Sequence, residues 1–278
     1  MFLCHKVINI LPISVKNSKK RCIFATNMTL DILICTIDEG IERVPEVLMS
    51  PRGDVRYVVS MQWTREAMRE RVPKVLRERE DVTVTFLEGK GLSRNRNHAL
   101  EMATGDVVLM ADDDNRYNEG LINNIFEAYE ENRGADVIFF QALDLEGKPL
   151  HRYPADYVCS VEMTFRREVK VRFDERFGLG SGRFCAGEEE VWRKDARDAG
   201  YHILQVDKPI VMTPKETTGR NFLGNKDLQK TKGATFRYVF GTGNAVWRSV
   251  KEAGWWMVHR GANPVPILWN MLQGLVEI

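Results

Sequence analysis

The chain has 278 residues, which is enough to bury the core of one α/β domain with a C-terminal appendage. Its 40 Lys and Arg residues and 39 Asp and Glu residues give a net charge of +1, without the basic excess of a nucleic-acid-binding protein. The five cysteines are widely spaced and form no Cys-x-x-Cys motif, so neither a disulfide framework nor a zinc site is predicted. A reducing, cytoplasmic setting is therefore expected. No apolar run reaches the ~18 to 20 residues of a membrane-spanning helix.

The first 27 residues do not fit a secretory signal. A weakly apolar start precedes the basic residues Lys16, Lys19, Lys20 and Arg21, which is the reverse of the order in a signal peptide. We expect residues 1–27 to be a disordered leader. The folded domain is expected to begin at Met28, which is also a candidate for the true start of the protein.

The next part of the chain alternates between strand-like and helix-like patterns. Apolar or alternating runs predict strands at 30–36, 55–61, 82–87, 106–110 and 135–142, and the segments between them predict helices at 41–49, 64–78, 94–103 and 121–131. This order predicts an α/β fold with a mostly parallel, doubly wound sheet. After residue 150 the pattern changes. We expect an antiparallel flap with strands 157–165 and 169–173, a helix at 187–199, a strand at 201–206, and helices from residue 228 onward.

Three carboxylates directly follow the fourth strand. Asp112, Asp113 and Asp114 then lie at the carboxyl end of that strand, where open α/β sheets bind ligands. Clustered carboxylates repel one another, and a hard cation such as Mg²⁺ or Mn²⁺ relieves that repulsion. The alternative is a solvated acidic turn. A calcium-binding EF-hand is excluded because Tyr117 and Asn123 occupy the positions of its glycine and glutamate.

The segment 91–115 resembles glycosyltransferase family 2, whose members have the GT-A fold. The family has a Gly-x-Ser-x-x-Arg-Asn helix start, a Thr-Gly turn, an apolar strand and an Asp-x-Asp metal motif. The matching positions are in register along this chain: Gly91, Ser93, Arg96, Asn97, Thr104, Gly105, Asp112 and Asp114.

The resemblance implies a site for a nucleotide-sugar donor and its Mn²⁺ or Mg²⁺ ion. It implies that Asp114 lies nearest the metal, with Asp112 nearer the nucleotide and Asp113 at the variable middle position. The start of the helix after Gly91 also favours a donor site, since a helix N-terminus and an arginine both attract a diphosphate. Ser93 is a plausible N-cap there. The remaining donor-binding candidates are the basic and polar residues Lys90, Ser93, Arg96 and Asn97, and, in the loop after the first strand, Thr36, Asp38 and Glu39.

Two departures from the family pattern concern the donor and the metal. The family usually has an aspartate after the second strand to hold the base, whereas this chain has Ser60, Met61 and Gln62. A metal-binding histidine of many relatives is replaced by Thr213. His98, His151, His202 and His259 have no ligand spacing among themselves, so structural or exposed roles are expected for them.

Glu188, Glu189 and Glu190 follow Gly187 and open a predicted helix. Sugar transfer to a hydroxyl needs a carboxylate base within hydrogen-bonding distance of the acceptor oxygen. In the resembled family a Glu-Asp pair after a glycine supplies it, which makes Glu189 the candidate base and Glu188 the alternate. The segment 173–189 also resembles the family's acceptor loop. The structural alternative is that acids favour the first turn of a helix and pair with Arg193 and Lys194.

Taken with the resemblance, the sequence predicts an inverting, metal-dependent glycosyltransferase. Its donor is expected to be a UDP-sugar and its acceptor a carbohydrate or lipid-linked glycan, as in bacterial polysaccharide synthesis. We expect a GT-A domain at 28–225, with donor half 28–142 and acceptor half 143–225, and a helical extension at 226–278. A non-catalytic sugar-nucleotide- or glycan-binding relative stays open as an alternative. A sugar-phosphate nucleotidyltransferase is disfavoured because no basic, Gly-rich loop follows the first strand.

The apolar C-terminal segment 264–278 has two interpretations. A helix packed against the domain is favoured, because the segment lacks the basic polar face of a membrane-surface helix. The alternative is a peripheral anchor at the inner membrane face.

Overall fold

The computed structural model describes residues 28–154, 157–214 and 218–278, so the predicted leader lies outside the described residues. Contacts divide the chain into two units, each discontinuous in sequence. The first, here called the sheet unit, contains residues 28–89, 98–170 and 196–214. The second, here called the helical unit, contains residues 90–97, 171–195 and 218–278. Helices α2 and α4 contribute residues to both.

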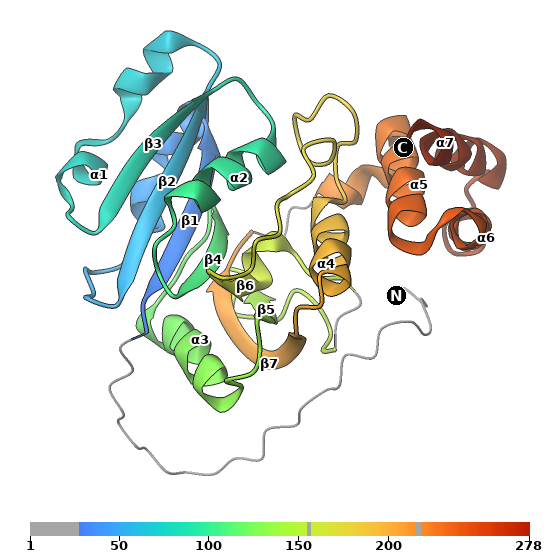
Figure 1. Cartoon of the computed structure of the whole chain (residues 1–278). Coiled ribbons are helices and arrows are strands. Elements are labelled where there is room, and N and C mark those ends of the chain that lie inside the picture. The colour runs from blue at the N-terminus through green and yellow to red at the C-terminus, as the bar shows by residue number, and fades with distance from the viewer. Residues whose placement is uncertain (1–27, 155–156, 215–217) are drawn as a thin grey trace. The chain divides into compact units, whose positions relative to one another are not determined.

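The sheet unit is built on a seven-stranded mixed sheet (Figure 1). Its strands are β1 (Leu30–Ile37), β2 (Val55–Trp63), β3 (Val82–Glu88), β4 (Val107–Asp112), β5 (Val137–Leu143), β6 (Met163–Arg166) and β7 (Ile203–Met212). They lie in the order β3-β2-β1-β4-β6-β5-β7, and β6 runs antiparallel to both of its neighbours. The predicted α/β class and mostly parallel sheet are confirmed.

Strand β1 lies in the interior of the sheet, where it pairs in parallel with β2 on one side and β4 on the other. Leu30, Ile32 and Ile34 are fully buried, as a near-continuous apolar run predicts for a central parallel strand. The buried carboxylate of Asp31 accepts hydrogen bonds from the backbone N–H groups of Thr104 (2.6 Å) and Gly105 (2.7 Å). The Thr-Gly turn is thereby fixed directly before β4, which positions that strand and the acidic residues after it.

Two predicted helices of the sheet unit are instead short helical turns. The segment 41–49 holds the 3₁₀ turns η1 (Asp38–Glu42) and η2 (Val44–Glu46), and 64–78 holds η3 (Glu66–Arg71) and the short α1 (Lys74–Glu78). Pro45 and Pro73 lack the N–H group that a continuous helix needs at those points. Thr64 does not cap a helix, because its N–H and hydroxyl groups donate to Asp38. The long helix predicted at 121–131 is present as α3 (Glu119–Glu131), capped by Asn118.

The predicted antiparallel flap is also different. Residues 160–162 form the 3₁₀ turn η4 (Ser160–Glu162), and β6 lies in the main sheet between β4 and β5. Residues 169–173 form no strand, since the chain turns where the Val169 N–H donates to the Arg166 carbonyl. The antiparallel direction was therefore predicted correctly for β6, whereas its place in the sheet was not.

The helical unit contains the start of α2 (Leu92–Met102), most of α4 (Glu188–Asp198), the turn η5 (Thr218–Gly224), and α5 (Lys226–Phe240), α6 (Thr242–Arg260) and α7 (Pro264–Glu277) (Figure 1). Helices α5 and α7 approach closely at Gly233 and Gly274, where an added Cβ would collide with the backbone of the other helix. Ile267 and Met271 of α7 are buried in a cluster with Phe222 and Leu228. One face of the C-terminal helix is thus packed against the helical unit, while the side chains of Val265 and Trp269 on this helix are exposed. Within the described ranges, no helix combines the length and hydrophobicity needed to cross a bilayer.

Candidate functional site

The sheet unit places its acidic cluster at a point where the strand order reverses. Strands β1 and β4 are adjacent and parallel, with Cys35 opposite Asp112, while β2 and β3 continue on the other side of β1. In open α/β sheets such a reversal leaves a crevice beyond the carboxyl ends of the strands, where ligands bind. Thr36 and the three aspartates therefore lie together at the edge that was predicted to hold the donor.

Asp113 is tied to the loop after β1. Its carboxylate accepts a hydrogen bond from the Thr36 hydroxyl (2.5 Å) and an ion-paired one from Arg43 (2.5 Å). Gly40 permits this contact, because a Cβ there would collide with both the Thr36 hydroxyl and the Asp113 carboxylate. The observed contacts show that Asp113 joins the end of β4 to the neighbouring loop. Direct contact of Asp113 with a bound donor stays a prediction.

Asp112 and Asp114 are the predicted metal ligands. Burial, and then the charge of Asp113, raises the pKa of Asp114 above its ordinary value, so its ionised form is held at a cost. A divalent cation would remove that cost, and carboxylate oxygens suit Mg²⁺ and Mn²⁺, so these residues fit such an ion. Among the described residues, Asp112, Asp113 and Asp114 do not form a group in which one oxygen from each lies within 4.8 Å of the other two.

Asp38 and Glu39, predicted to contact the donor, bind the loop after β2 instead. The Asp38 carboxylate accepts from the Thr64 N–H (2.8 Å) and hydroxyl (2.7 Å). Glu39 forms an ion pair with Arg65. Asp38 has a φ of 46°, in the left-handed region that aspartate tolerates better than most residues. These contacts account for both side chains without a ligand, and a donor role for them stays a prediction.

The helical unit gathers the predicted residues at the start of α2 around the segment 173–189. The Ser93 hydroxyl donates to the Phe177 carbonyl (2.6 Å), so Ser93 is buried inside the first turn and is not the N-cap that was predicted. The Asn97 side chain donates to the Phe173 carbonyl (2.9 Å) and accepts from its N–H (2.8 Å). Lys90 is exposed. Ser93 and Asn97 thus hold the backbone of the predicted acceptor segment in place. Their direct contact with a donor stays a prediction.

Arg96 pairs with the acidic start of α4. Its Nη1 lies 3.1 Å from Glu188 Oε1 and 3.6 Å from Glu189 Oε1, and its guanidinium lies 5.3 Å from the centre of the Phe173 ring. The side chain of Arg96 is only 2 % exposed, against 6 % for Glu188 and 12 % for Glu189. Glu188 and Glu189 therefore share a buried cation, whereas the surface pairs expected for Glu189 with Arg193 and for Glu190 with Lys194 stay a prediction.

The two glutamates differ in their surroundings. Burial and the neighbouring Glu188 raise the pKa of Glu189 to about 8, although Arg96 acts in the opposite direction. Glu188 Oε2 has no hydrogen-bond partner among the residues that the structure describes. Gly178, at φ 101°, covers this pair, and a Cβ there would meet the Ser93 hydroxyl at 2.9 Å. A carboxylate with a pKa near the working pH suits proton transfer, which is the role predicted for Glu189.

Sequence reasoning missed Arg43, because the spacing of apolar residues around it predicted a helix and gave no sign of a partner 70 residues away. It also assigned Arg96 to the donor diphosphate and did not foresee its pairing with the glutamates. Thr213 follows β7, where its N–H donates to the Leu143 carbonyl (2.9 Å). Nothing in that contact tests whether it replaces a metal ligand.

Comparison with known proteins gives a family model and several similar solved structures. The model described as Glycosyl transferase family 2 matches residues 60–191. The crystal structure of S. aureus TarS 1–349 has a TM-score of 0.59 and 13% identity, covering 90% of this chain and 90% of that one. The same fragment in complex with UDP-GlcNAc has a TM-score of 0.55 and 12% identity, with 90% of each chain covered.

A longer S. aureus TarS structure has a TM-score of 0.52 and 13% identity, and the match covers 84% of this chain. This chain spans 44% of the length of that TarS chain. No curated protein matched the sequence. At such identities the structural likeness shows a shared fold, here of the GT-A type.

Proposed function

Because residues 60–191 match the model described as Glycosyl transferase family 2, we propose that the chain is a glycosyltransferase that moves a sugar from a UDP-sugar to an acceptor hydroxyl with metal assistance and inversion. The observation that carries the proposal is the acidic cluster of the sheet unit. Asp112 ends β4, and Asp113 and Asp114 follow it at the reversal of strand order, within the segment that matches the family model. The shared fold with TarS, whose structure was solved with UDP and with UDP-GlcNAc, supports UDP as the carrier.

In the donor half, Asp114 and Asp112 would hold Mn²⁺ or Mg²⁺. Such an ion neutralises the charge that develops on a leaving diphosphate. Asp113 contributes indirectly, because its contacts with Thr36 and Arg43 fix the loop after β1 beside β4. This loop is the part of the sheet edge from which the nucleoside would be contacted.

In the acceptor half, Glu189 is the proposed base and Glu188 the alternate. The acceptor hydroxyl gives its proton to the Glu189 carboxylate as its oxygen forms a bond to the anomeric carbon. The bond from that carbon to the diphosphate breaks, and UDP leaves with the electron pair. Glu188 keeps Arg96 beside the base, and Arg96 limits the rise in the pKa of Glu189. Attack opposite to the leaving group inverts the anomeric centre.

The acceptor is proposed to be a carbohydrate or lipid-linked glycan of a bacterial polysaccharide or surface glycan. Peripheral contact with the inner membrane face is part of the same proposal. The exposed side chains of Trp247, Val258 and Trp269 on α6 and α7 are compatible with it.

The test is thermal unfolding of the whole chain with UDP, UDP-sugars and other nucleoside diphosphates, each with and without Mn²⁺. A ligand of the native state at 100 times its Kd stabilises it by about 2.7 kcal/mol. We expect UDP to raise the Tm only with Mn²⁺, and Asp114→Asn to abolish this response. Asp207→Asn is the matched control, because Asp207 is an exposed carboxylate of the same unit that accepts from Gln141.

A UDP response that is unchanged in Asp114→Asn would refute the metal assignment. Binding of a UDP-sugar without UDP release in the presence of an acceptor panel would favour the non-catalytic alternative. Release of UDP that follows acceptor concentration supports the transferase.

A further inference from the structure

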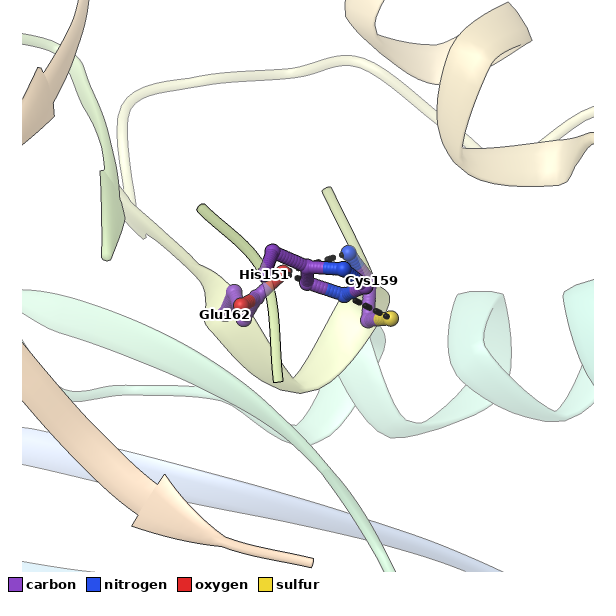
Figure 2. A group of neighbouring side chains, drawn as sticks. All are labelled: His151, Cys159 and Glu162. Carbon is purple, nitrogen blue, oxygen red and sulfur yellow. Dashed lines mark hydrogen bonds and ion pairs between the residues drawn. The ribbon is translucent and has the colours of Figure 1, made fainter. Parts of the chain in front are cut away.

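The segment between β5 and β6 brings together three side chains that the proposed transfer reaction does not use. His151, Cys159 and Glu162 all belong to the sheet unit, and Figure 2 shows the imidazole of His151 between the sulfur of Cys159 and the carboxylate of Glu162. One ligand atom from each lies within 4.8 Å of the other two. Among the described residues, this is the one group of three or more His, Cys, Asp or Glu side chains with that geometry.

A single nitrogen of His151 faces both partners. Its Nε2 lies 3.5 Å from Cys159 Sγ and 4.0 Å from Glu162 Oε2. A neutral imidazole nitrogen carries either one N–H or one lone pair, so it cannot make a good hydrogen bond to both. Around a tetrahedral zinc ion, bonds of about 2.0 to 2.3 Å place neighbouring ligand atoms roughly 3.3 to 3.7 Å apart. The observed separations require little adjustment to reach that geometry.

Two backbone N–H groups fix the orientation of the Glu162 carboxylate. Glu162 Oε1 accepts from the Ala142 N–H (2.9 Å), and Oε2 accepts from the Cys159 N–H (2.8 Å). Hydrogen bonds of this kind orient ligands around metal ions. The turn η4 alone accounts for the contact between Cys159 and Glu162, which form a capping box. It does not account for His151, which comes from a separate part of the segment.

We propose that His151, Cys159 and Glu162 bind a zinc ion that ties His151 to the turn η4. Sulfur, imidazole nitrogen and carboxylate oxygen form a ligand set for Zn²⁺, distinct from the oxygen ligands that suit Mn²⁺ or Mg²⁺ at Asp112 and Asp114. Binding replaces the thiol proton of Cys159 with the metal and releases that proton to solvent. Three protein ligands leave the fourth tetrahedral position to water. This site was not predicted from the sequence, because the separations of eight and three residues fit no recognised zinc motif.

The test uses Co²⁺ as a spectroscopic substitute for Zn²⁺ in the full chain after removal of metals by a chelator. We expect one Co²⁺ per chain with a thiolate-to-cobalt charge-transfer band that Zn²⁺ abolishes by displacement. Cys159→Ser should lose the band. His151→Asn and Glu162→Gln should weaken binding at least about tenfold, which is the lower range for removal of an outer-shell partner alone. Cys185→Ser is the matched control, since Cys185 is also half-buried but contacts Thr231.

A charge-transfer band that persists in Cys159→Ser, or its absence from the wild type, would overturn the proposal. The band should remain in Asp114→Asn, which separates this site from the donor metal. If Cys159→Ser fails to fold, alkylation of the wild type gives the answer. Zn²⁺ should slow modification of Cys159 and not of Cys185, as peptide mass spectrometry measures, and equal rates with and without Zn²⁺ would exclude the site.

Discussion

The two acidic triplets of this chain have opposite surroundings. Asp112, Asp113 and Asp114 follow a strand, and the middle carboxylate is held by Thr36 and by Arg43, whose side chain is 58 % exposed. Glu188, Glu189 and Glu190 begin a helix, and the first two share one buried arginine. The first cluster lies at the reversal of strand order in the sheet unit. The second lies in the helical unit, where its first two residues end the segment 173–189.

If the proposed roles are correct, this difference in surroundings gives the two acidic triplets different chemistry. A metal-binding carboxylate must stay ionised, and the aspartates lie where a cation can neutralise them. A proton-accepting carboxylate works best with a pKa near the working pH, and burial beside Glu188 raises the pKa of Glu189 to about 8. The assignment of the two roles therefore depends on what surrounds each triplet more than on the triplet itself.

The sharpest way to separate the triplets is Glu189→Gln. This variant keeps the shape of the side chain and removes its ability to accept a proton, so kcat should fall by about 10²- to 10⁴-fold. The UDP- and Mn²⁺-dependent rise in Tm should be unchanged. Glu190→Gln is the control from the same helical turn and should keep nearly full activity. Equal losses in the two variants would point to a general effect of charge at the helix start.

Removal of Arg96 tests the buried pairing. Arg96→Gln leaves Glu188 and Glu189 without their shared cation, and breaking a buried ion pair costs about 3 to 5 kcal/mol. Urea unfolding measures the loss. The control is Arg94→Gln, an exposed position on the same helix, where a change within about 0.5 kcal/mol is expected. If the two variants lose similar stability, Arg96 is not the residue that stabilises the glutamates.

As the pH rises, activity should increase while the contribution of Glu189 to folding stability should decrease. The base acts in its ionised form, so kcat/KM should rise with pH and reach half of its plateau at about pH 8. The pKa of Glu189 is raised from its ordinary value of 4.5, so its contribution to stability is full below pH 4.5 and is lost as the pH rises through about 8. Glu189→Gln should remove this part of the stability profile. A pH–rate profile that is flat between pH 6 and 9 would contradict the assignment.

Local patterns predicted most of the sheet, because strands such as β1 and β4 are apolar runs bounded by turn residues. They failed where tertiary contacts decide the structure. Proline and the contact between Asp38 and Thr64 shorten two expected helices, and β6 takes its place between β4 and β5 through pairings with strands that are distant in sequence.

The candidate site shows the same limit. Asp112, Asp114 and Glu189 could be proposed from the sequence because each belongs to a recognisable local motif, and their roles stay predictions. The pairing of Asp113 with Arg43, and that of His151 with Cys159, depend on how distant or unpatterned residues meet. No spacing rule identifies such pairs before the fold is known.

The smallest expected effect lies within the first triplet. Asp113→Asn removes an ion pair with Arg43, an exposed side chain, and pairs of this kind contribute about 0 to 1 kcal/mol. The Tm should fall slightly, and the response to UDP with Mn²⁺ should remain, in contrast to Asp114→Asn. Arg43→Gln should have a similar effect, and the double variant should be no worse than either single variant, because both remove the same interaction. If Asp113→Asn instead abolishes the metal response, the middle aspartate is itself a metal ligand, and the division of roles within this triplet is wrong.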